Sequence, residues 1–237
     1  MDNIEELKKK IDDLAKDASF IVVSPDTLEK LKAGGFPVQS RFIPYKEYLD
    51  KLFEEKRKGA DEIIKNFPPI SENLANASVK SLYEEIRECY ALGLFGAVIT
   101  LSVIFLELGL KYGVYNEKEK HNQNSLWEDI EEMNFRATIK SLRKFGKISE
   151  PEKKELDKFN LEVRNPYIHY NLKKLVNGVF AEKMPTVDTK TAEVKILERV
   201  DIARHPYLWF SGKKFRDKKE VDNVLNFCIG WVNKVLG

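Results

Sequence analysis

Cysteine and histidine are scarce in this sequence of 237 residues, which contains two of the first and three of the second. Cys89 and Cys228 lie far apart in apolar stretches, and no CxxC pair or histidine cluster has the spacing of metal ligands. We therefore expect no metal site and no other cofactor. Two isolated cysteines in apolar surroundings are typical of buried thiols in a reducing compartment.

An excess of charge of one sign is also missing. The 40 lysine and arginine residues are balanced by 38 aspartate and glutamate residues, for a formal net charge of +2. This balance argues against general binding to nucleic acid or acidic membranes, so any polyanion site must be local. The first residues, MDNIEELKKKIDDL, lack the apolar segment and the small-residue cleavage site of a secretory signal. We expect a cytoplasmic protein.

Charge is absent from one long run, CYALGLFGAVITLSVIFL at 89–106, which by length alone could cross a membrane. The run contains Gly93, Gly96, Thr100 and Ser102, and it has no strongly basic flank to orient it in a bilayer. Amphipathic segments elsewhere in the chain can surround such a helix. We interpret the run as the buried central helix of a bundle and expect no membrane span.

Two adjacent prolines, Pro68 and Pro69, mark a division of the chain at about residue 70, because their missing amide donors forbid continuation of the preceding helix. Residues 1–70 are predicted to form a mostly helical extension. Its expected parts are a helix with heptad-like Ile4, Leu7, Ile11 and Leu14, a strand or extended piece near residue 20, a helix before Gly34, and a polar helix at about 44–67.

Residues 71–237 are predicted to contain four helices, the first at about 78–112. Each of the other three begins with a capping-box pattern, in which a serine or aspartate is followed three residues later by a glutamate. These pairs are Ser125 with Glu128, Ser149 with Glu152, and Asp217 with Glu220. The second and third helices are expected to end near Gly146 and Gly178.

The segment 179–212 lacks the helical spacing of apolar residues seen on either side of it. Its TAEVKILERVDI alternates like a strand, and its HPYLWFSG is typical of a turn-rich connector. We expect a small irregular or β-hairpin insert before the last helix. The predicted fold class is all-α, an up-and-down helical bundle at 71–237 with the mostly helical extension at 1–70.

The stretch EVRNPYIHYN, at 162–171, interrupts the third predicted helix. On an unbroken helix, Arg164 and His169 would be rotated by about 140° from one another. Pro166 lacks an amide donor and presses on the carbonyl four residues back, so the turn around Glu162 should kink or open. Such a bend could bring Arg164 and His169 together.

The residue types suit phosphodiester chemistry. Histidine is the residue whose unperturbed side-chain pKa lies nearest neutrality, so a histidine at 169 could take a proton from a ribose 2′-hydroxyl or give one to the leaving oxygen. The guanidinium of Arg164 matches phosphate oxygens and stays charged while the phosphorane forms. Asn165 could hold a phosphate oxygen or orient the histidine ring. This set requires no metal.

The motif resembles that of the HEPN superfamily, an arginine followed by a polar residue and, a few residues later, a histidine. RNPYIH fits with four intervening residues, Asn165 to Ile168. Members carry this motif on the third helix of a bundle, after a long apolar helix that often has a glutamate near its end. Glu107 is the matching position, followed one turn later by Lys111. The resemblance covers about 71–237.

The resemblance implies a metal-independent endoribonuclease of toxin, antiviral defence or RNA-processing type, with two copies of the motif meeting across a homodimer. Arg164 and His169 would be catalytic, Asn165 would support them, and Glu107 would lie behind the catalytic pair and orient it. RNA or nucleotide is the implied partner, and an antitoxin or a nucleotidyltransferase is a further implied partner. Other members are non-catalytic modules that bind nucleotide, RNA or a partner protein.

Plainer alternatives stay open. Arg164 could pair with Glu162 or Glu152, His169 could pack among neighbouring side chains, and Glu107 could pair with Lys111 by i, i+4 spacing. Tyr167 and Tyr170 could stack on bases or fill a dimer interface. The basic clusters at 140–147, 173–174 and 213–219 could follow an RNA backbone or form solvated faces. A third hypothesis is a helical protein with a purely structural role.

Overall fold

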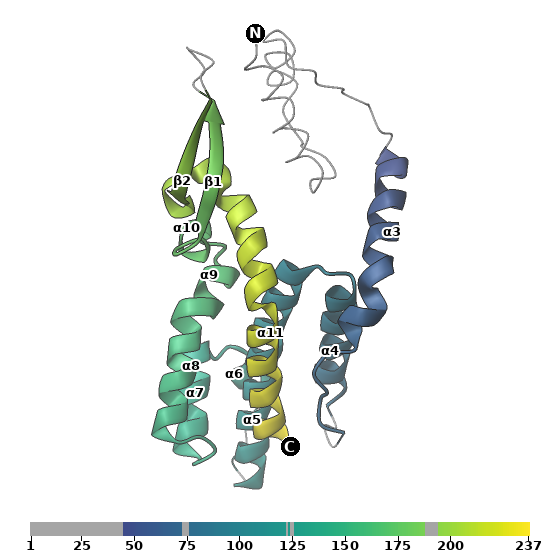
Figure 1. The fold of residues 1–237 in the computed structure, drawn as a ribbon. Helices are drawn as coiled ribbons and strands as arrows, with labels where there is room; N and C mark the ends of the chain where they lie inside the picture. Colours follow the sequence, from purple (N-terminus) through teal and green to yellow (C-terminus); the bar gives the residue numbers. More distant parts are fainter. Residues whose placement is uncertain (1–44, 73–75, 122, 124–125, 188–193) are drawn as a thin grey trace, which may run out of the picture. The chain divides into compact units, whose positions relative to one another are not determined.

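The computed structural model describes residues 45–72, 76–121, 123, 126–187 and 194–237 (Figure 1). The predicted helix at 4–14, the strand near 20, the helix before Gly34 and the cap at Ser125 lie outside these residues. The chain divides into two compact units, Met1–Asp50 and Lys51–Gly237. The seam predicted near residue 70 stays a prediction.

The described residues are mostly helical, which confirms the all-α class and the helical-bundle character. The helices are α3 (Tyr45–Ile64), α4 (Ala77–Ala91), α5 (Phe95–Lys120), α6 (Trp127–Glu131), α7 (Phe135–Lys144), α8 (Glu150–Phe159), α9 (Asn165–Ile168), α10 (Leu172–Leu175) and α11 (Trp209–Leu236). An antiparallel hairpin of β1 (Phe180–Val187) and β2 (Val194–Asp201) precedes α11, as the alternating sequence predicts. Its register pairs Phe180 with Asp201 and Val187 with Val194.

The larger of two apolar clusters in the second unit forms where α5 packs along α4 and α11 (Figure 1), and the smaller one consists of Val176, Val179 and Ile202. Close approach of α5 to α11 depends on glycine. A Cβ added at Gly109 would lie 2.6 Å from Cγ2 of Val232, and one at Gly113 would collide with Val235. Small residues at these positions let the two backbones meet, so α5 becomes the central helix of the bundle.

Helix α5 is also the one helix in the described part of the chain that is long and apolar enough to cross a membrane. Of its most apolar 18-residue window, 56% is buried inside the protein. Core helices of soluble proteins pass the same test of length and composition, and the burial of α5 against α4 and α11 favours that interpretation.

The long helix predicted at 78–112 is two helices. Gly93, with φ of +61°, ends α4 in a Schellman motif. Its N–H donates to the carbonyl of Tyr90 at 2.9 Å, and the N–H of Leu94 donates to the carbonyl of Cys89 at 2.9 Å. The break falls inside an uninterrupted apolar run, where no polar residue or proline marks it.

Two other predicted helices also differ. The helix expected between Ser125 and Gly146 is split into α6 and α7, because the side chain of Asn134 accepts from the N–H of Ala137 at 3.0 Å and starts a new helix. The last helix begins at Trp209, so the start predicted at Asp217 is wrong. The capping box of Ser149 and Glu152 is confirmed at the start of α8.

Candidate functional site

The third predicted helix is interrupted where Pro166 predicts a bend. After α8 the chain makes a π-helical turn at Asn160–Arg164, in which the N–H of Asn165 donates to the carbonyl of Asn160. In a regular α-helix the ring of Pro166 would clash with the carbonyl oxygen four residues back. The wider π-helical turn changes the backbone at this point and relieves the clash. Turns of this kind within α-helices are frequent at functional sites.

The short helix α9 then ends sharply after His169. The N–H of Tyr170 donates to the carbonyl of Tyr167 at 3.2 Å, and the N–H of Asn171 donates to that of Pro166 at 2.9 Å. This is again a Schellman motif, but its left-handed position holds Tyr170, with φ of 48°. Tyr170 is the one non-glycine residue with a positive φ in the described part of the chain. The backbone beside His169 is therefore strained, by about 1–3 kcal/mol.

Arg164 is held from two sides. Its Nη2 donates to Oε2 of Glu107 on α5 at 3.0 Å, and its Nη1 donates to Oδ1 of Asn165 at 3.1 Å. The Cζ atom lies 5.8 Å from the ring centroid of Phe135, which sequence reasoning missed. The structure thus joins the neighbours Arg164 and Asn165 to Glu107, which lies 57 positions before Arg164 in the sequence.

Glu107 serves two cations, since Nζ of Lys111 lies 3.6 Å from its Oε1. The same lysine donates to the carbonyl of Glu131 at 2.6 Å. The pairing of Glu107 with Lys111 that the i, i+4 spacing allows is therefore present, and the contact of Glu107 with Arg164 adds to it. Glu162 lies 3.9 Å from Lys158 instead of pairing with Arg164.

Two polar atoms on the π-helical turn are buried without a hydrogen-bond partner among the described residues. They are Nε of Arg164 and Oδ1 of Asn160, one helical turn earlier. An unpaired buried polar group costs about 1–3 kcal/mol. Together with Tyr170, these atoms concentrate unfavourable energy in the segment that carries the motif.

His169 is exposed, and its ring makes no hydrogen bond, ion pair or ring contact within the described residues. The π-helical turn ends at Arg164, whereas the following Asn165–Ile168 is α-helical. The rotation of about 140° between Arg164 and His169 therefore remains. The bend does not produce the convergence expected within one chain, and joint action of the two groups requires a substrate or a second copy to connect them.

Tyr167 is 5% exposed, so its ring is unavailable for stacking on bases. Its hydroxyl donates to Oδ1 of Asp217 at 2.6 Å, and Nζ of Lys213 donates to Oδ2 of the same carboxylate at 2.6 Å. Burial, followed by the hydrogen bond and charge of Asp217, raises the pKa of Tyr167 far above its usual range. This polar group fixes α9 against α11. Tyr170 is 54% exposed, with Nζ of Lys213 lying 5.8 Å from its ring centroid.

This group is hard to predict from the sequence, because Lys213 and Asp217 at i, i+4 spacing look like an ordinary surface pair. Arg216 is also occupied, since its Nη1 donates to the carbonyl of Leu175 at 2.8 Å. Of the basic cluster at 213–219, the exposed lysines are Lys214, Lys218 and Lys219.

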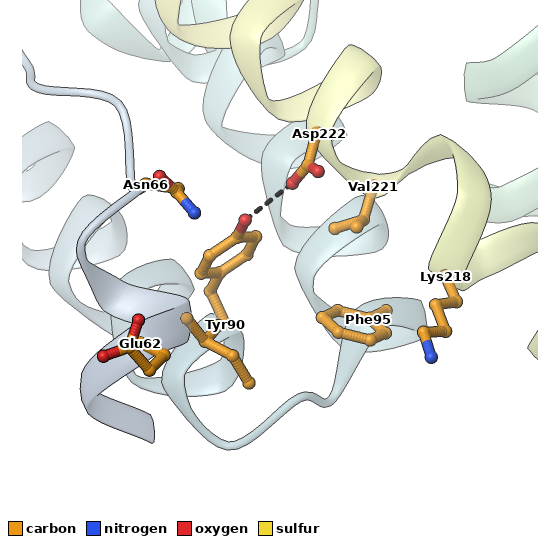
Figure 2. Close-up of a pocket in the computed structure, with 8 residues that line it drawn as sticks. Glu62, Asn66, Tyr90, Phe95, Lys218, Val221 and Asp222 are labelled. Carbon is orange, nitrogen blue, oxygen red and sulfur yellow. Dashed lines mark hydrogen bonds between the residues drawn. The ribbon is translucent and has the colours of Figure 1, made fainter. Parts of the chain in front are cut away.

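An open pocket of about 340 Å³ lies elsewhere on the second unit (Figure 2). It is lined by Glu62, Ile63, Asn66, Tyr90, Phe95, Lys218, Val221 and Asp222. The hydroxyl of Tyr90 donates to Oδ1 of Asp222 at 2.6 Å, and burial, followed by this hydrogen bond, raises the pKa of Tyr90 beyond its usual range. None of the residues predicted for the site lines this pocket, and its central tyrosine and aspartate already satisfy one another.

The residues that the structure describes include no group of three or more histidine, cysteine, aspartate or glutamate side chains able to hold a metal. Burial raises the pKa of the Cys228 thiol well above its usual range, and burial followed by Glu88 and Glu85 raises that of Cys89. Neither thiol is activated as a nucleophile.

No protein-family model, curated protein or solved structure matches this chain. The resemblance to the HEPN superfamily therefore rests on the motif and its surroundings in this sequence, and it stays a hypothesis.

Proposed function

We propose that this chain is a HEPN-like protein of the cytoplasm that cleaves RNA without a metal. The observation that supports this most is the arrangement of Arg164. Glu107 and Asn165 fix its guanidinium, and the same short helix ends one turn later in the exposed imidazole of His169. RNA cleavage by acid–base chemistry needs a fixed guanidinium and an unoccupied imidazole, and this segment of the chain carries one of each.

In the proposed reaction, a ribose 2′-oxygen attacks the adjacent phosphorus, and the bond from phosphorus to the 5′-oxygen breaks. His169 either takes the proton of the 2′-hydroxyl or protonates the leaving 5′-oxygen. Arg164 stabilises the added negative charge on the phosphorane oxygens. The products are a 2′,3′-cyclic phosphate and a free 5′-hydroxyl.

The proposed site is shared by two copies of the chain. Arg164 and His169 point in different directions from α9, so a single copy does not present both to one phosphate. A homodimer can place the arginine of one copy near the histidine of the other. In a toxin or defence system, an antitoxin or a nucleotidyltransferase would be the partner that restrains such a dimer.

A non-catalytic module that binds nucleotide, RNA or a partner protein is the second candidate. One observation favours it. The charge of Arg164 is already compensated by Glu107 at 3.0 Å, and this ion pair joins α5 to the π-helical turn. An arginine that is paired in this way could bind an anion weakly without stabilising a transition state.

The test is cleavage of single-stranded RNA in EDTA by the wild type and by the His169→Ala and Arg164→Ala variants. We expect cleavage by the wild type and a loss of at least a hundredfold in each variant, since acid–base catalysis by one group contributes about 10²–10⁴. RNA with 2′-O-methyl groups should resist cleavage, because the attacking hydroxyl is blocked.

His205→Ala is the matched control, since this histidine lies outside the motif and contacts Tyr207. It should cleave as the wild type does. Cleavage that survives both motif variants would exclude this site as the active one. Absence of cleavage, combined with RNA or nucleotide binding that Arg164→Ala removes, would favour the non-catalytic module.

A further inference from the structure

The first half of α11 exposes two phenylalanines and three lysines, Phe210, Lys214, Phe215, Lys218 and Lys219, here called the α11 stripe, together with Ser211 and Asp222. The two phenyl rings are 65% and 63% exposed. At about 100° per residue the five positions fall within one half of the helix circumference, in the order Phe210, Lys214, Lys218, Phe215, Lys219. We propose that the α11 stripe binds single-stranded RNA, through lysine contacts to phosphates and phenyl stacking on bases.

The charge of this surface is mostly positive, with three exposed lysines and one exposed carboxylate, Asp222, whose Oδ1 accepts a hydrogen bond from Tyr90. Asp217 is the one acidic residue in the sequence from Trp209 to Lys219. Its carboxylate is buried and is neutralised by Lys213 at 2.6 Å. Lys213 donates to Asp217 and Arg216 donates to the carbonyl of Leu175, so both cations already have protein partners. The three stripe lysines have no partner among the described residues, so their charges face solvent.

The opposite side of the same helical turns is anchored. Nε1 of Trp209 donates to the carbonyl of Ala203 at 3.2 Å. A Cβ added at Gly212 would lie 2.7 Å from Cγ2 of Ile202, which shows how closely α11 approaches the end of the hairpin. These contacts fix the rotation of α11, and the stripe is held outward on a rigid element.

The order of residues around the helix favours RNA over a lipid bilayer. Helices that lie in a membrane interface separate an apolar face from a charged face. In the α11 stripe, Phe215 lies between lysines around the circumference, so burying its ring in acyl chains would bring ammonium groups with it. Single-stranded nucleic acid offers phosphates and base faces at alternating positions, which matches interleaved lysine and aromatic side chains.

The stripe leads to the motif. Tyr170, the residue after His169, has its ring centroid 5.8 Å from Nζ of Lys213, the neighbour of Lys214. The hydrogen bond from Tyr167 to Asp217 joins α9 to the same part of α11. In the proposal, a strand bound along the stripe continues past this contact toward His169. This last step rests on the proposed ribonuclease, whereas the binding itself does not.

The experiment measures binding of a fluorescein-labelled 2′-O-methyl RNA, about 20 nucleotides long, to the full chain in EDTA at several salt concentrations. Phe210→Ala with Phe215→Ala should weaken binding at least tenfold, since one stacked base is worth about 1–3 kcal/mol. The plot of log K against log salt has a negative slope for a protein that contacts phosphates. Alanine at all three stripe lysines should make this slope shallower by about 2.

Two comparisons separate stacking from general damage. Phe210→Tyr with Phe215→Tyr should retain binding, because tyrosine also stacks. An abasic strand of equal length should bind the wild type more weakly and should lose little more when both phenylalanines are removed. The matched control is Phe53→Ala with Arg57→Ala and Lys58→Ala, which removes one exposed phenyl ring and two cations from α3 and should change neither affinity nor salt slope.

The proposal is overturned if the wild type does not bind the RNA, if the stripe variants bind as the wild type does, or if the control variant loses as much. It is also overturned if the stripe variants lose binding to phosphatidylserine vesicles but keep binding to RNA. Weakened RNA binding without any cleavage would retain the stripe and remove the ribonuclease. Cleavage that depends on His169, with RNA binding unaffected by the stripe variants, would do the reverse.

Discussion

Tyr170 shows how a single residue can store unfavourable energy next to a candidate site. Its φ of 48° is a region that glycine occupies without cost, and its ring is 54% exposed. Little apolar burial compensates for the strain. Strained backbones persist where the surrounding structure holds them and are frequent at sites of function. The position between His169 and the start of α10 fits that pattern.

Replacing Tyr170 with glycine should therefore stabilise the protein. The gain over Tyr170→Ala should be about 1 kcal/mol, since alanine keeps the strain and glycine removes it. For a protein of this size, that difference corresponds to a midpoint of thermal unfolding higher by about 2–4 °C. The measurement is thermal unfolding followed by circular dichroism. Equal midpoints for the glycine and alanine variants would show that the turn carries no strain.

Individual residues of the site could be predicted unequally well. The motif identified Arg164 and Asn165, the resemblance added Glu107, and the structure joins these three by hydrogen bonds. The role of Tyr167 could not be predicted, since its partner Asp217 lies 50 positions further along the chain. Long-range hydrogen bonds of this kind leave no local pattern in the sequence.

Among the elements, helix identity was easier to predict than helix ends. The polar helix at 44–67, the hairpin and the capping box at Ser149 follow local rules, and the structure contains all three. The break at Gly93 and the early start of α11 depend on tertiary packing. Gly93 lies in an apolar run, and Asp217 has the spacing of a cap but is buried as the partner of Tyr167 and Lys213.

Helix α5 ends with a pH-sensitive contact. Glu117 accepts from Lys120 at 3.0 Å and lies 3.4 Å from Nζ of Lys147, in the turn after α7. Burial alone would raise the pKa of Glu117, but the hydrogen bonds and charges of the two lysines outweigh it and lower the pKa below its usual range. The ionised carboxylate is therefore favoured in the folded protein, and it connects α5 to this turn.

A lowered folded pKa means that this stabilisation is present above the unfolded pKa, about 4.3, and is lost as the pH falls through the folded value. Glu117→Gln should therefore reduce stability near neutral pH and make it depend less on pH between about 6 and 3. Urea unfolding at a series of pH values measures this. Glu128→Gln, on the exposed side of α6, is the control. A Glu117→Gln protein with the pH dependence of the wild type would contradict the assignment.

For the whole molecule, the central question is whether two copies join at the motif. The proposed shared site needs an interface that includes α9, the π-helical turn and the neighbouring face of α5. Two exposed apolar side chains lie there. Leu161, on the π-helical turn, is 56% exposed, and Ile104, one turn before Glu107 on α5, is 42% exposed. Exposed apolar side chains near a candidate site are typical of interfaces.

Ile104→Glu with Leu161→Glu should therefore convert the proposed dimer to a monomer, since two carboxylates buried in an interface lose their hydration without gaining partners. Light scattering after size exclusion measures the mass directly. Leu197→Glu, a change at a 41% exposed leucine of the hairpin, should leave the dimer intact. RNA cleavage should be lost when the dimer is lost. Each monomer should still bind RNA through its own α11 stripe. A wild type that is monomeric at every concentration would remove the shared site, because Arg164 and His169 then have no second copy to complete them.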